Sequence, residues 1–453
     1  MYSINSKTKT QLTLVANKVT KDHEKYSYFL KDQKIIFVLD EKHFCFRRFN
    51  WKIRELFGKF RNSFNVDLNS FLSIIPNVFH QSVITCMINN SEYFNDLLFN
   101  LKTNKNNQII NNFIINNKYQ KMLNFSKLMV QASNFARQLQ LMPNNYMNPS
   151  TFAEMIKKNF KHFNNLVDIE ILNKSDLIKK QMGLILSVGN ASNQKNEPKL
   201  ISIKFKNSKP KFAIVGKGIT FDTGGINLKP SAYLAGMQYD MSGAAIAAGV
   251  MYAFCLNKMK PDFAVVMPLA VNEIGANCTK VGDVITSYSK KTVEITNTDA
   301  EGRLILADGI TYAIKDLGVK SVLTIATLTG AIVVALGDMY TGFWSTNSDN
   351  IDLFDKAAKS AGEYVWNLPF NQYFTDALKD SMLADLVNCV EKPSAGSISA
   401  ASFLKEFAKS VDFIHLDIAG TSEFKARGKS YPIPVMIDTL FEYVKNNFYG
   451  KSK

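Results

Sequence analysis

The sequence predicts an α/β protein: a larger C-terminal domain with a mixed, largely parallel sheet flanked by helices, and a smaller, divergent N-terminal α/β domain. From about residue 145 onward, short apolar runs alternate with segments of helical periodicity. These runs are apolar on both faces, which is typical of strands that helices cover on both sides of a sheet. We predict strands at residues 182–188, 211–215, 263–267, 321–326 and 413–418.

The first 120 residues follow a different pattern, and 453 residues suit two domains. Runs at 34–39 and 71–75 predict strands, whereas the asparagine-rich stretch at 104–118 predicts a loop. Apolar spacing over 122–142 predicts a connecting helix. The expected division is a small α/β domain at 1–120, a helix and linker at 121–144, and a C-terminal domain at 145–453. Partial burial within the loop is indicated by Ile109, Ile110, Phe113, Ile114 and Ile115.

Composition narrows the class of protein. The chain is 46% hydrophobic, so it can bury a large core. No apolar run reaches the roughly 18 residues that a membrane span needs. The N-terminus lacks the apolar core of a signal peptide, so we expect a cytoplasmic location and no membrane partner. The five cysteines contain no C-x-x-C pair, which indicates reduced and mostly buried thiols.

The net charge of +15 could indicate nucleic-acid binding, because basic surfaces attract polyanions. The lysines, however, are spread along a chain that is rich in Asn, Lys, Ile and Phe, as expected from an AT-rich coding sequence. Nucleic-acid binding is therefore the weaker interpretation. His415 lies in an apolar run and is predicted to be a hydrogen-bonded core residue.

The octapeptide at 297–304, Asn-Thr-Asp-Ala-Glu-Gly-Arg-Leu, carries two carboxylates and a guanidinium at alternate positions. An apolar segment follows and predicts a buried helix. Carboxylates at a helix entrance suit hard or borderline cations, and the helix N-terminus favours negative charge. Alone, the pattern would also fit a solvated surface turn.

A second cluster favours the metal interpretation. Residues 215–230 form a glycine-rich segment after a predicted strand, and it contains Lys217, Asp222 and Lys229. Asp240 follows, just before a run of small residues that predicts a tightly packed helix. Buried charges are normally paired or bound to metal, and four acidic groups could carry about two divalent cations. The segment matches neither the P-loop nor the dinucleotide-binding pattern.

Together these segments resemble the leucyl aminopeptidases (cytosol aminopeptidases), a family of dinuclear-zinc exopeptidases. The similarity covers about residues 145–440, with motifs at 215–230, 240–245, 297–304, 326–331 and 415–421. The resemblance implies a metal-dependent aminopeptidase that hydrolyses an apolar, leucine-like N-terminal residue from peptides with a free N-terminus. It also implies a homo-hexamer.

The resemblance further implies roles for individual residues. Asp222 and Glu301 are similar to ligands that bridge two metal ions, Lys217 and Asp240 to ligands of one ion, and Asp299 to a ligand of the other. Zinc is the first expectation, and manganese, magnesium and cobalt are alternatives. Lys229 and Arg303 resemble the two catalytic groups that do not bind metal, and bicarbonate is expected at Arg303. The residues that resemble substrate contacts are Met237, Thr327, Leu328 and Gly330.

The chemistry is consistent with these roles. Two cations about 3–4 Å apart can share a hydroxide that is nucleophilic at neutral pH. An ammonium at Lys229 would stabilise the tetrahedral gem-diolate. No histidine is among the residues to which these roles are given, so a proton shuttle would be a carboxylate, a water or a bound anion such as bicarbonate. Departures from the family pattern occur at Val281, 140–145 and 388–393, and none replaces a proposed ligand.

Two rival functions remain open. A two-metal phosphoesterase or nuclease could also use clustered aspartates, although such sites often include histidines. A DNA-binding or scaffold protein could keep the fold without the activity. Such a protein would usually have lost ligands, whereas every key position is filled here.

Overall fold

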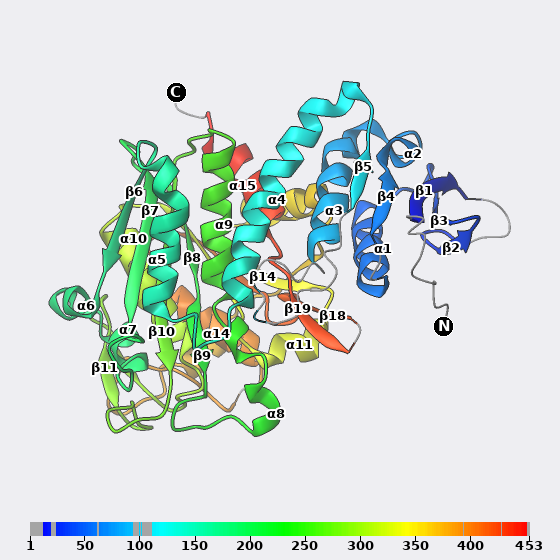
Figure 1. Ribbon diagram of the computed structural model, residues 1–453. Helices are drawn as coiled ribbons and strands as arrows, with labels where there is room; N and C mark the ends of the chain where they lie inside the picture. The colour runs from blue at the N-terminus through cyan, green and yellow to red at the C-terminus, as the bar shows by residue number, and fades with distance from the viewer. Residues whose placement is uncertain are drawn as a thin grey trace. The chain divides into compact units, whose positions relative to one another are not determined.

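The computed structural model describes residues 12–19, 24–60, 63–93, 99, 101, 111–392, 394–426 and 428–450. As predicted, the chain is α/β, and it forms two compact units (Figure 1). One unit comprises 1–134, 359–363 and 425–431, and the other comprises 135–358, 364–424 and 432–453. The boundary between the two units falls within helix α4 (Gln120–Leu141). The presence of α4 confirms the helix predicted at 122–142. The division at residues 120 and 144 stays a prediction.

The first unit contains a five-stranded sheet with strand order β2-β3-β1-β4-β5. Strand β1 is parallel to β3 and β4, and β2 forms an antiparallel edge. Its core includes the rings of Phe37, Phe49 and Phe71, whose centroids are 5.7–6.1 Å apart. The elements are β1 (Leu12–Lys18), β2 (Tyr28–Lys31), β3 (Lys34–Leu39), α1 (Phe46–Lys59), β4 (Phe64–Asp67), α2 (Leu68–Leu72), α3 (His80–Tyr93) and β5 (Asn112–Ile114).

Two predictions for this unit are wrong or only partly confirmed. The run at 71–75 ends helix α2 rather than forming a strand, because the Asp67 side chain accepts a hydrogen bond from the Asn69 N–H and starts a helix there. The stretch at 104–118 contains the short strand β5, with Phe113 and Ile115 half-buried and Ile114 exposed. Ile109 and Ile110 lie outside the described residues.

The second unit contains a nine-stranded mixed sheet in the order β15-β14-β17-β13-β8-β10-β7-β6, with β9 also paired to β10. Its central strands β17, β13, β8 and β10 are parallel, and antiparallel strands lie on either side. Four of the five predicted strands are confirmed, as β8, β10, β13 and β17. The strands are β6 (Val167–Leu172), β7 (Lys199–Phe205), β8 (Phe212–Gly216), β9 (Gly218–Asp222), β10 (Phe263–Asn272), β13 (Ser321–Ala326), β14 (Thr341–Ser345), β15 (Val365–Asn367) and β17 (Asp412–Asp417).

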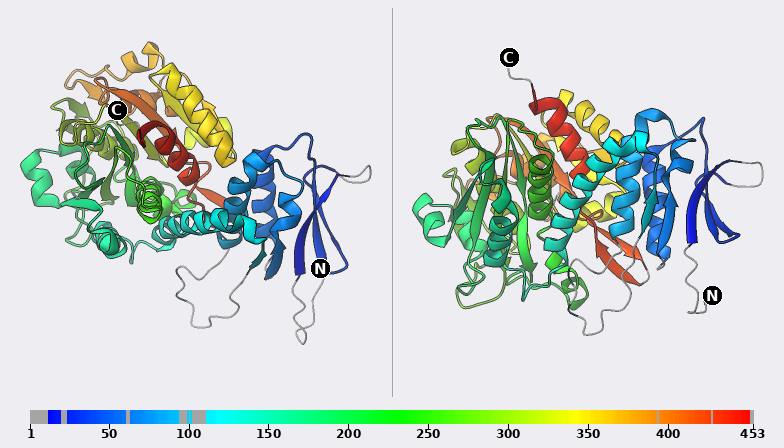
Figure 2. Two further views of the ribbon diagram at one scale, coloured as in Figure 1. Left: turned by 90° about the horizontal axis from the view of Figure 1, so that it is seen from above. Right: turned by 45° about the horizontal axis from the view of Figure 1, so that its top comes forward.

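Helices cover both faces of this sheet (Figure 2). A Cβ on Gly216 of β8 would meet the Gly243 carbonyl of α9, whereas the side chain of the preceding Val215 lies against Gly309 of α10. Successive strand residues point to opposite faces, so α9 and α10 lie on opposite faces of the sheet. The helices are α5 (Pro149–Phe160), α6 (Lys174–Lys180), α7 (Gly183–Val188), α8 (Ser231–Leu234), α9 (Ser242–Leu256), α10 (Gly302–Lys315), α11 (Gly330–Leu336), α12 (Ser348–Ala361), α13 (Gln372–Ala377), α14 (Gly396–Lys405) and α15 (Ile437–Phe448).

Smaller sheets complete the described chain. Strands β11 (Val284–Thr286), β12 (Thr292–Glu294) and β16 (Leu386–Val387) form a three-stranded sheet, and β18 (Glu423–Ala426) pairs with β19 (Lys429–Pro432). Among the residues described, no helix is long and apolar enough to cross a membrane.

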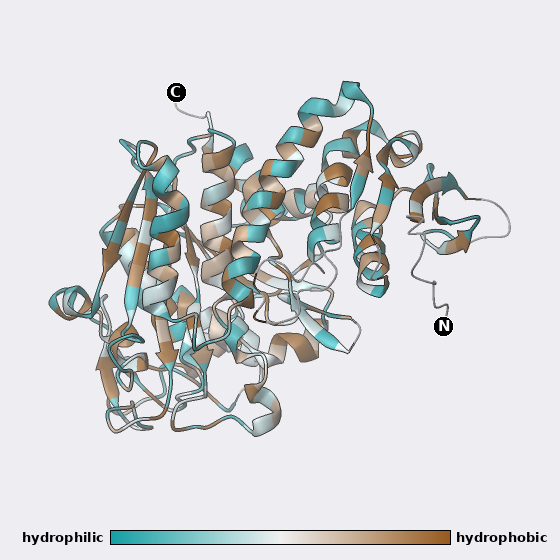
Figure 3. Cartoon of the chain, in the orientation of Figure 1, coloured by the Kyte–Doolittle hydropathy of each residue, from teal (hydrophilic) through white to brown (hydrophobic). Residues whose placement is uncertain are grey.

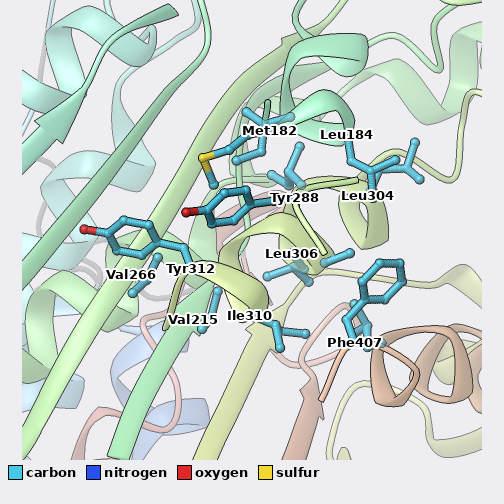
Figure 4. Close-up of a cluster of buried hydrophobic side chains, with 14 of the residues drawn as sticks. Met182, Leu184, Val215, Val266, Tyr288, Leu304, Leu306, Ile310, Tyr312 and Phe407 are labelled. Atoms are coloured by element: carbon cyan, nitrogen blue, oxygen red, sulfur yellow. The ribbon is translucent and has the colours of Figure 1, made fainter. Parts of the chain in front are cut away.

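The packing of α9 and α10 explains their sequences. Residues 242–255 of α9 are all buried, and the helix is pale to brown in Figure 3, whereas α5 alternates between polar and apolar colours. Around α10, Leu304, Leu306 and Ile310 contribute to a buried cluster with Val215 of β8 and Val266 of β10 (Figure 4). The octapeptide therefore leads into a helix that is anchored in the core.

The predicted strand at 182–188 is wrong, because this segment forms helix α7. Leu184, Ile185 and Val188 are buried against the α10 cluster. The carboxylate of Asp308 on α10 accepts hydrogen bonds from the N–H groups of Leu184 and Ile185, which would otherwise be unpaired at the start of the helix. The tertiary contact with α10 therefore decides the conformation of an apolar run that is too short to show a period.

Candidate metal centre

The predicted site residues lie on loops at the carboxyl edge of the parallel strands, where ligand sites of open α/β sheets occur. Lys217 separates β8 from β9, and Asp222 ends β9. Asp240 lies two residues before the start of α9. The octapeptide lies immediately before and within the first turn of α10, and residues 327–329 connect β13 to α11.

Three carboxylates form the middle of the site. One oxygen from each of Asp222, Asp299 and Glu301 can be chosen such that all three lie within 4.8 Å of one another. Asp222 and Glu301 are each 2% exposed, and Asp299 is half-buried. Such closely spaced buried carboxylates repel one another unless positive charge is held between them.

Two lysines supply positive charge to this cluster. The Lys217 Nζ is 2.7 Å from the Asp240 Oδ1 and 3.0 Å from the Glu301 Oε1, and it also donates to the Thr327 carbonyl. The Lys229 Nζ is 2.8 Å from the Asp222 Oδ2 and also contacts the Asp299 carboxylate. All five predicted metal ligands are therefore brought together with Lys229.

The electrostatics show how strongly the cluster favours positive charge. Burial acts to lower the pKa of Lys217, but the charges of Asp240, Glu301 and Asp222 outweigh it and raise the pKa above its ordinary value. Burial raises the pKa of Asp240, and burial together with the charge of Asp222 raises that of Glu301. These shifts all act in the direction that brings positive charge into the cluster.

The residues present fit divalent metal ions. The Asp240 Oδ2 is buried and has no hydrogen-bond partner within the described parts of the chain, so it is available for coordination. The donor set of carboxylates and one amine suits zinc, manganese, magnesium or cobalt. Gly302 makes the close approach possible, because a Cβ there would lie 2.4 Å from the Lys217 Cε.

Arg303 extends from the first turn of α10 and is buried. Its Nη1 donates to the Asn388 carbonyl at 2.8 Å. Its Nε has no hydrogen-bond partner among the residues that the structure describes. Burial lowers the pKa of Arg303, and the nearby charge of Glu301 opposes this shift. An unpaired, buried guanidinium N–H is a donor that suits a planar anion.

The predicted substrate residues are placed less completely. The Thr327 Oγ1 donates to the Asp240 Oδ1 at 2.7 Å, which brings Thr327 to the metal centre. Met237 is half-buried and begins the short helical turn that leads to Asp240. Leu328 is half-buried and lies on the same connection as Thr327, and Gly330 is exposed at the start of α11.

Sequence analysis missed residues that hold the site in place. Asn272, at the end of β10, donates from its Nδ2 to the Asp222 Oδ1 and to the Thr298 carbonyl, at 2.8 and 3.0 Å. Asn388 is fully buried, and its side chain accepts from the Thr296 N–H and donates to the Asn297 carbonyl. The signal for Asn388 was its place in the segment that departs from the family pattern, whereas nothing in the sequence distinguished Asn272.

Other predicted residues lie away from the chemistry. His415 is fully buried, and its Nδ1 lies 2.8 Å from the Thr324 Oγ1, which confirms a hydrogen-bonded core residue. None of the five cysteines forms a disulfide bond in the structure, and Cys86, Cys255 and Cys278 are buried. The prediction that the thiols are mostly buried is therefore confirmed, and their reduced state stays a prediction.

Comparisons with known proteins agree with this geometry. A model of the cytosol aminopeptidase family, catalytic domain, matches residues 134–440. A probable cytosol aminopeptidase of Mycoplasma pneumoniae is 38% identical over 84% of this chain and 85% of its own length. One from Mycoplasma genitalium is 38% identical over 88% and 89%, and one from Legionella pneumophila strain Corby is 40% identical over 72% and 68%.

Proposed function

The chain belongs to the cytosol aminopeptidase family, and from this premise we propose that it is a metal-dependent aminopeptidase that removes an apolar, leucine-like residue from the N-terminus of peptides. The observation that carries the proposal is the buried cluster of Lys217, Asp222, Asp240 and Glu301 at the edge of the sheet. Asp299 completes the ligand set.

We assign the ligands as follows. Asp222 and Glu301 would help to hold both ions, Lys217 and Asp240 would hold one, and Asp299 would hold the other. Two divalent ions, with zinc the first expectation, would supply a water activated at neutral pH and a charge clamp for the substrate. As a ligand, Lys217 would have to be a neutral amine and would give up the proton of the ammonium that pairs with Asp240 and Glu301.

Lys229 is proposed to act without binding metal. Burial lowers its pKa, but the charges of Asp222 and Glu301 outweigh burial and raise it, so the side chain stays an ammonium. The Lys229 side chain is 15% exposed, whereas that of Lys217 is 3% exposed, so Lys229 is the more accessible of the two lysines in the cluster. A fixed ammonium at the open side of the centre can stabilise the oxyanion that forms when the peptide carbonyl is attacked.

Arg303 is proposed to hold a bicarbonate that exchanges protons near the substrate. The free Nε supports this role, because a bidentate oxyanion needs guanidinium donors that the protein has not already used. No histidine is among the proposed site residues, which leaves an anion, a water or a carboxylate as the proton carrier.

Substrate contacts are proposed for the connection between β13 and α11. The Leu328 N–H donates to the Asp417 Oδ1, so its carbonyl is the group that remains for the peptide backbone. Met237, Thr327 and Gly330 would form the walls of the pocket for the first side chain, which would explain an apolar preference. We also propose a cytoplasmic location and a homo-hexameric assembly, by extension from the family.

The proposal is tested by Glu301→Gln, which keeps the size of the side chain but removes its charge. We expect hydrolysis of a leucyl anilide to be lost and metal content, measured by elemental analysis, to fall, with an unchanged circular dichroism spectrum. Asp316→Asn, an acidic position away from the cluster, serves as the control. Full activity of Glu301→Gln would disprove the site, and hydrolysis of phosphoesters but not anilides by the wild-type protein would favour a phosphoesterase.

A further inference from the structure

We propose that Asp417 is a positioning residue that holds the connection between β13 and α11 in the conformation that binds the peptide. The inference rests on the proposed function, because that connection carries Thr327 and Leu328 and leads directly to Gly330. Asp417 itself touches no proposed metal ligand in the contacts described, and it acts through the backbone of the residues beside it.

The register of the sheet brings Asp417 to this connection. Asp417 is the last residue of β17 and pairs with Ala326, the last residue of β13. Its Oδ1 accepts from the N–H groups of Leu328 and Ala419 at 3.1 and 3.2 Å. Its Oδ2 accepts from the Thr329 Oγ1 at 2.6 Å. One carboxylate therefore fixes both the N–H of Leu328 and the hydroxyl of Thr329.

The same connection is held from its other side by the metal centre. The Thr327 Oγ1 donates to Asp240, and the Thr327 carbonyl accepts from the Lys217 ammonium. Thr329 also caps α11, because its Oγ1 accepts from the Ile332 N–H. With Thr327 tied to the metal centre and Leu328 tied to Asp417, the peptide group between them has little freedom to rotate.

The buried Asp417 carboxylate is stabilised by the hydrogen bonds that it accepts from this connection. Asp417 is 1% exposed, and burying an acidic group without partners is unfavourable. Only a carboxylate offers two oxygens that can accept from three donors at once. Burial raises the pKa of Asp417 to about 6, while the N–H and hydroxyl donors oppose that shift. The geometry is thus a dedicated acceptor for one connection.

The chain provides a matched control in Asp308. This carboxylate is also fully buried and accepts from three backbone N–H groups, those of Leu184, Ile185 and Tyr288. Its donors carry no proposed substrate contact. If Asp417 merely stabilised the fold, replacing either aspartate would have the same consequences for kinetics.

The experiment compares wild type with Asp417→Ala, Asp417→Asn and Asp308→Ala. Hydrogen exchange, followed by mass spectrometry, reports on the segment 327–333 without substrate. Steady-state hydrolysis of a leucyl anilide gives KM and kcat, and elemental analysis gives metal content. We expect Asp417→Ala to exchange faster in this segment and to raise KM about tenfold, equivalent to about 1.4 kcal/mol of binding free energy. Its kcat and metal content should change by less than about threefold.

Asp417→Asn should recover most of the affinity, because its Oδ1 can still accept from Leu328 and Ala419. Asp308→Ala should leave KM and the exchange of 327–333 unchanged. If Asp417→Ala does not fold, Thr329→Val, which removes the hydroxyl donor, should raise KM in the same direction. An unchanged KM, an unchanged exchange rate, or an equal rise of KM in Asp308→Ala would overturn the inference. An inactive wild type would overturn the proposed function alone, and the exchange rates would still decide whether Asp417 holds this connection.

Discussion

At the residue scale, Lys217 and Gly302 determine how the two halves of the proposed metal centre meet. Lys217 lies between β8 and β9, and it reaches Glu301 only because residue 302 has no side chain in its path. The same ammonium pairs with Asp240 on the far side. The glycine of the octapeptide is therefore part of the site, although it offers no ligand.

Lys229 can be tested separately from the metal ligands. We expect Lys229→Ala to lower kcat by about 10²–10³-fold, the usual effect of removing an oxyanion-stabilising donor. Metal content should be retained, because the remaining carboxylates and Lys217 still form the ligand set. Lys229→Arg, which keeps the charge, should lose less activity. Loss of metal from Lys229→Ala, measured by elemental analysis, would instead assign Lys229 to the ligands.

The sequence indicates the proposed ligands, but it does not indicate the groups that hold their side chains in place. Asp222, Asp299 and Glu301 stand in motifs whose charges lie beside glycines and apolar runs, so their type and spacing indicate chemistry. Nothing in the sequence marks Asn272, and Asp417 lies in the motif at 415–421 without a role that the sequence assigns to it. Their roles appear only when β10 and β17 bring them beside Asp222 and Leu328. Long-range register is the information that local patterns lack.

At the scale of elements, the same limit separates the correct strands from the wrong ones. The runs that became β8, β13 and β17 are central strands whose apolar residues are covered on both faces. The runs at 71–75 and 182–188 are also apolar, but a carboxylate accepts hydrogen bonds from N–H groups at the start of each helix. Asp67 has this role for α2, and Asp308 has it for α7. Only Asp67 lies close enough in sequence to be recognised beforehand.

The dependence of α7 on Asp308 can be measured. Asp308→Ala would leave the N–H groups of Leu184, Ile185 and Tyr288 buried without a partner. At about 1–3 kcal/mol for each unsatisfied group, we expect the free energy of unfolding to fall by at least about 3 kcal/mol. Urea denaturation followed by circular dichroism is the measurement. A loss below about 1 kcal/mol would mean that water replaces the carboxylate and that α7 does not depend on it.

At the scale of the whole molecule, two buried regions of opposite character share the second unit. The metal centre gathers carboxylates at the edge of the sheet, whereas the sheet interior between β13, β14 and β17 holds the neutral ring of His415 beside Trp344. The first region favours positive charge and the second excludes it. Acid should therefore affect the fold through both, and the contribution of His415 can be isolated by mutation.

The His415 ring is fully buried, and its Nε2 has no hydrogen-bond partner within the described chain. Burial, together with the charge of Arg303, lowers the pKa of His415 from 6.5 to about 3. Below pH 6.5 the unfolded chain binds a proton at this position while the folded protein does not, so stability is lost as the pH falls towards 3. The loss from this group is roughly 1.4 kcal/mol per pH unit within that window.

His415→Asn can keep the hydrogen bond to Thr324 but cannot titrate, so its free energy of unfolding should fall less steeply. Between pH 6.5 and 4.5 we expect the two proteins to converge by roughly 2–3 kcal/mol in urea denaturation. Equal losses in both proteins would show that His415 accepts a proton in the folded state, and that the sheet interior tolerates charge beside Arg303.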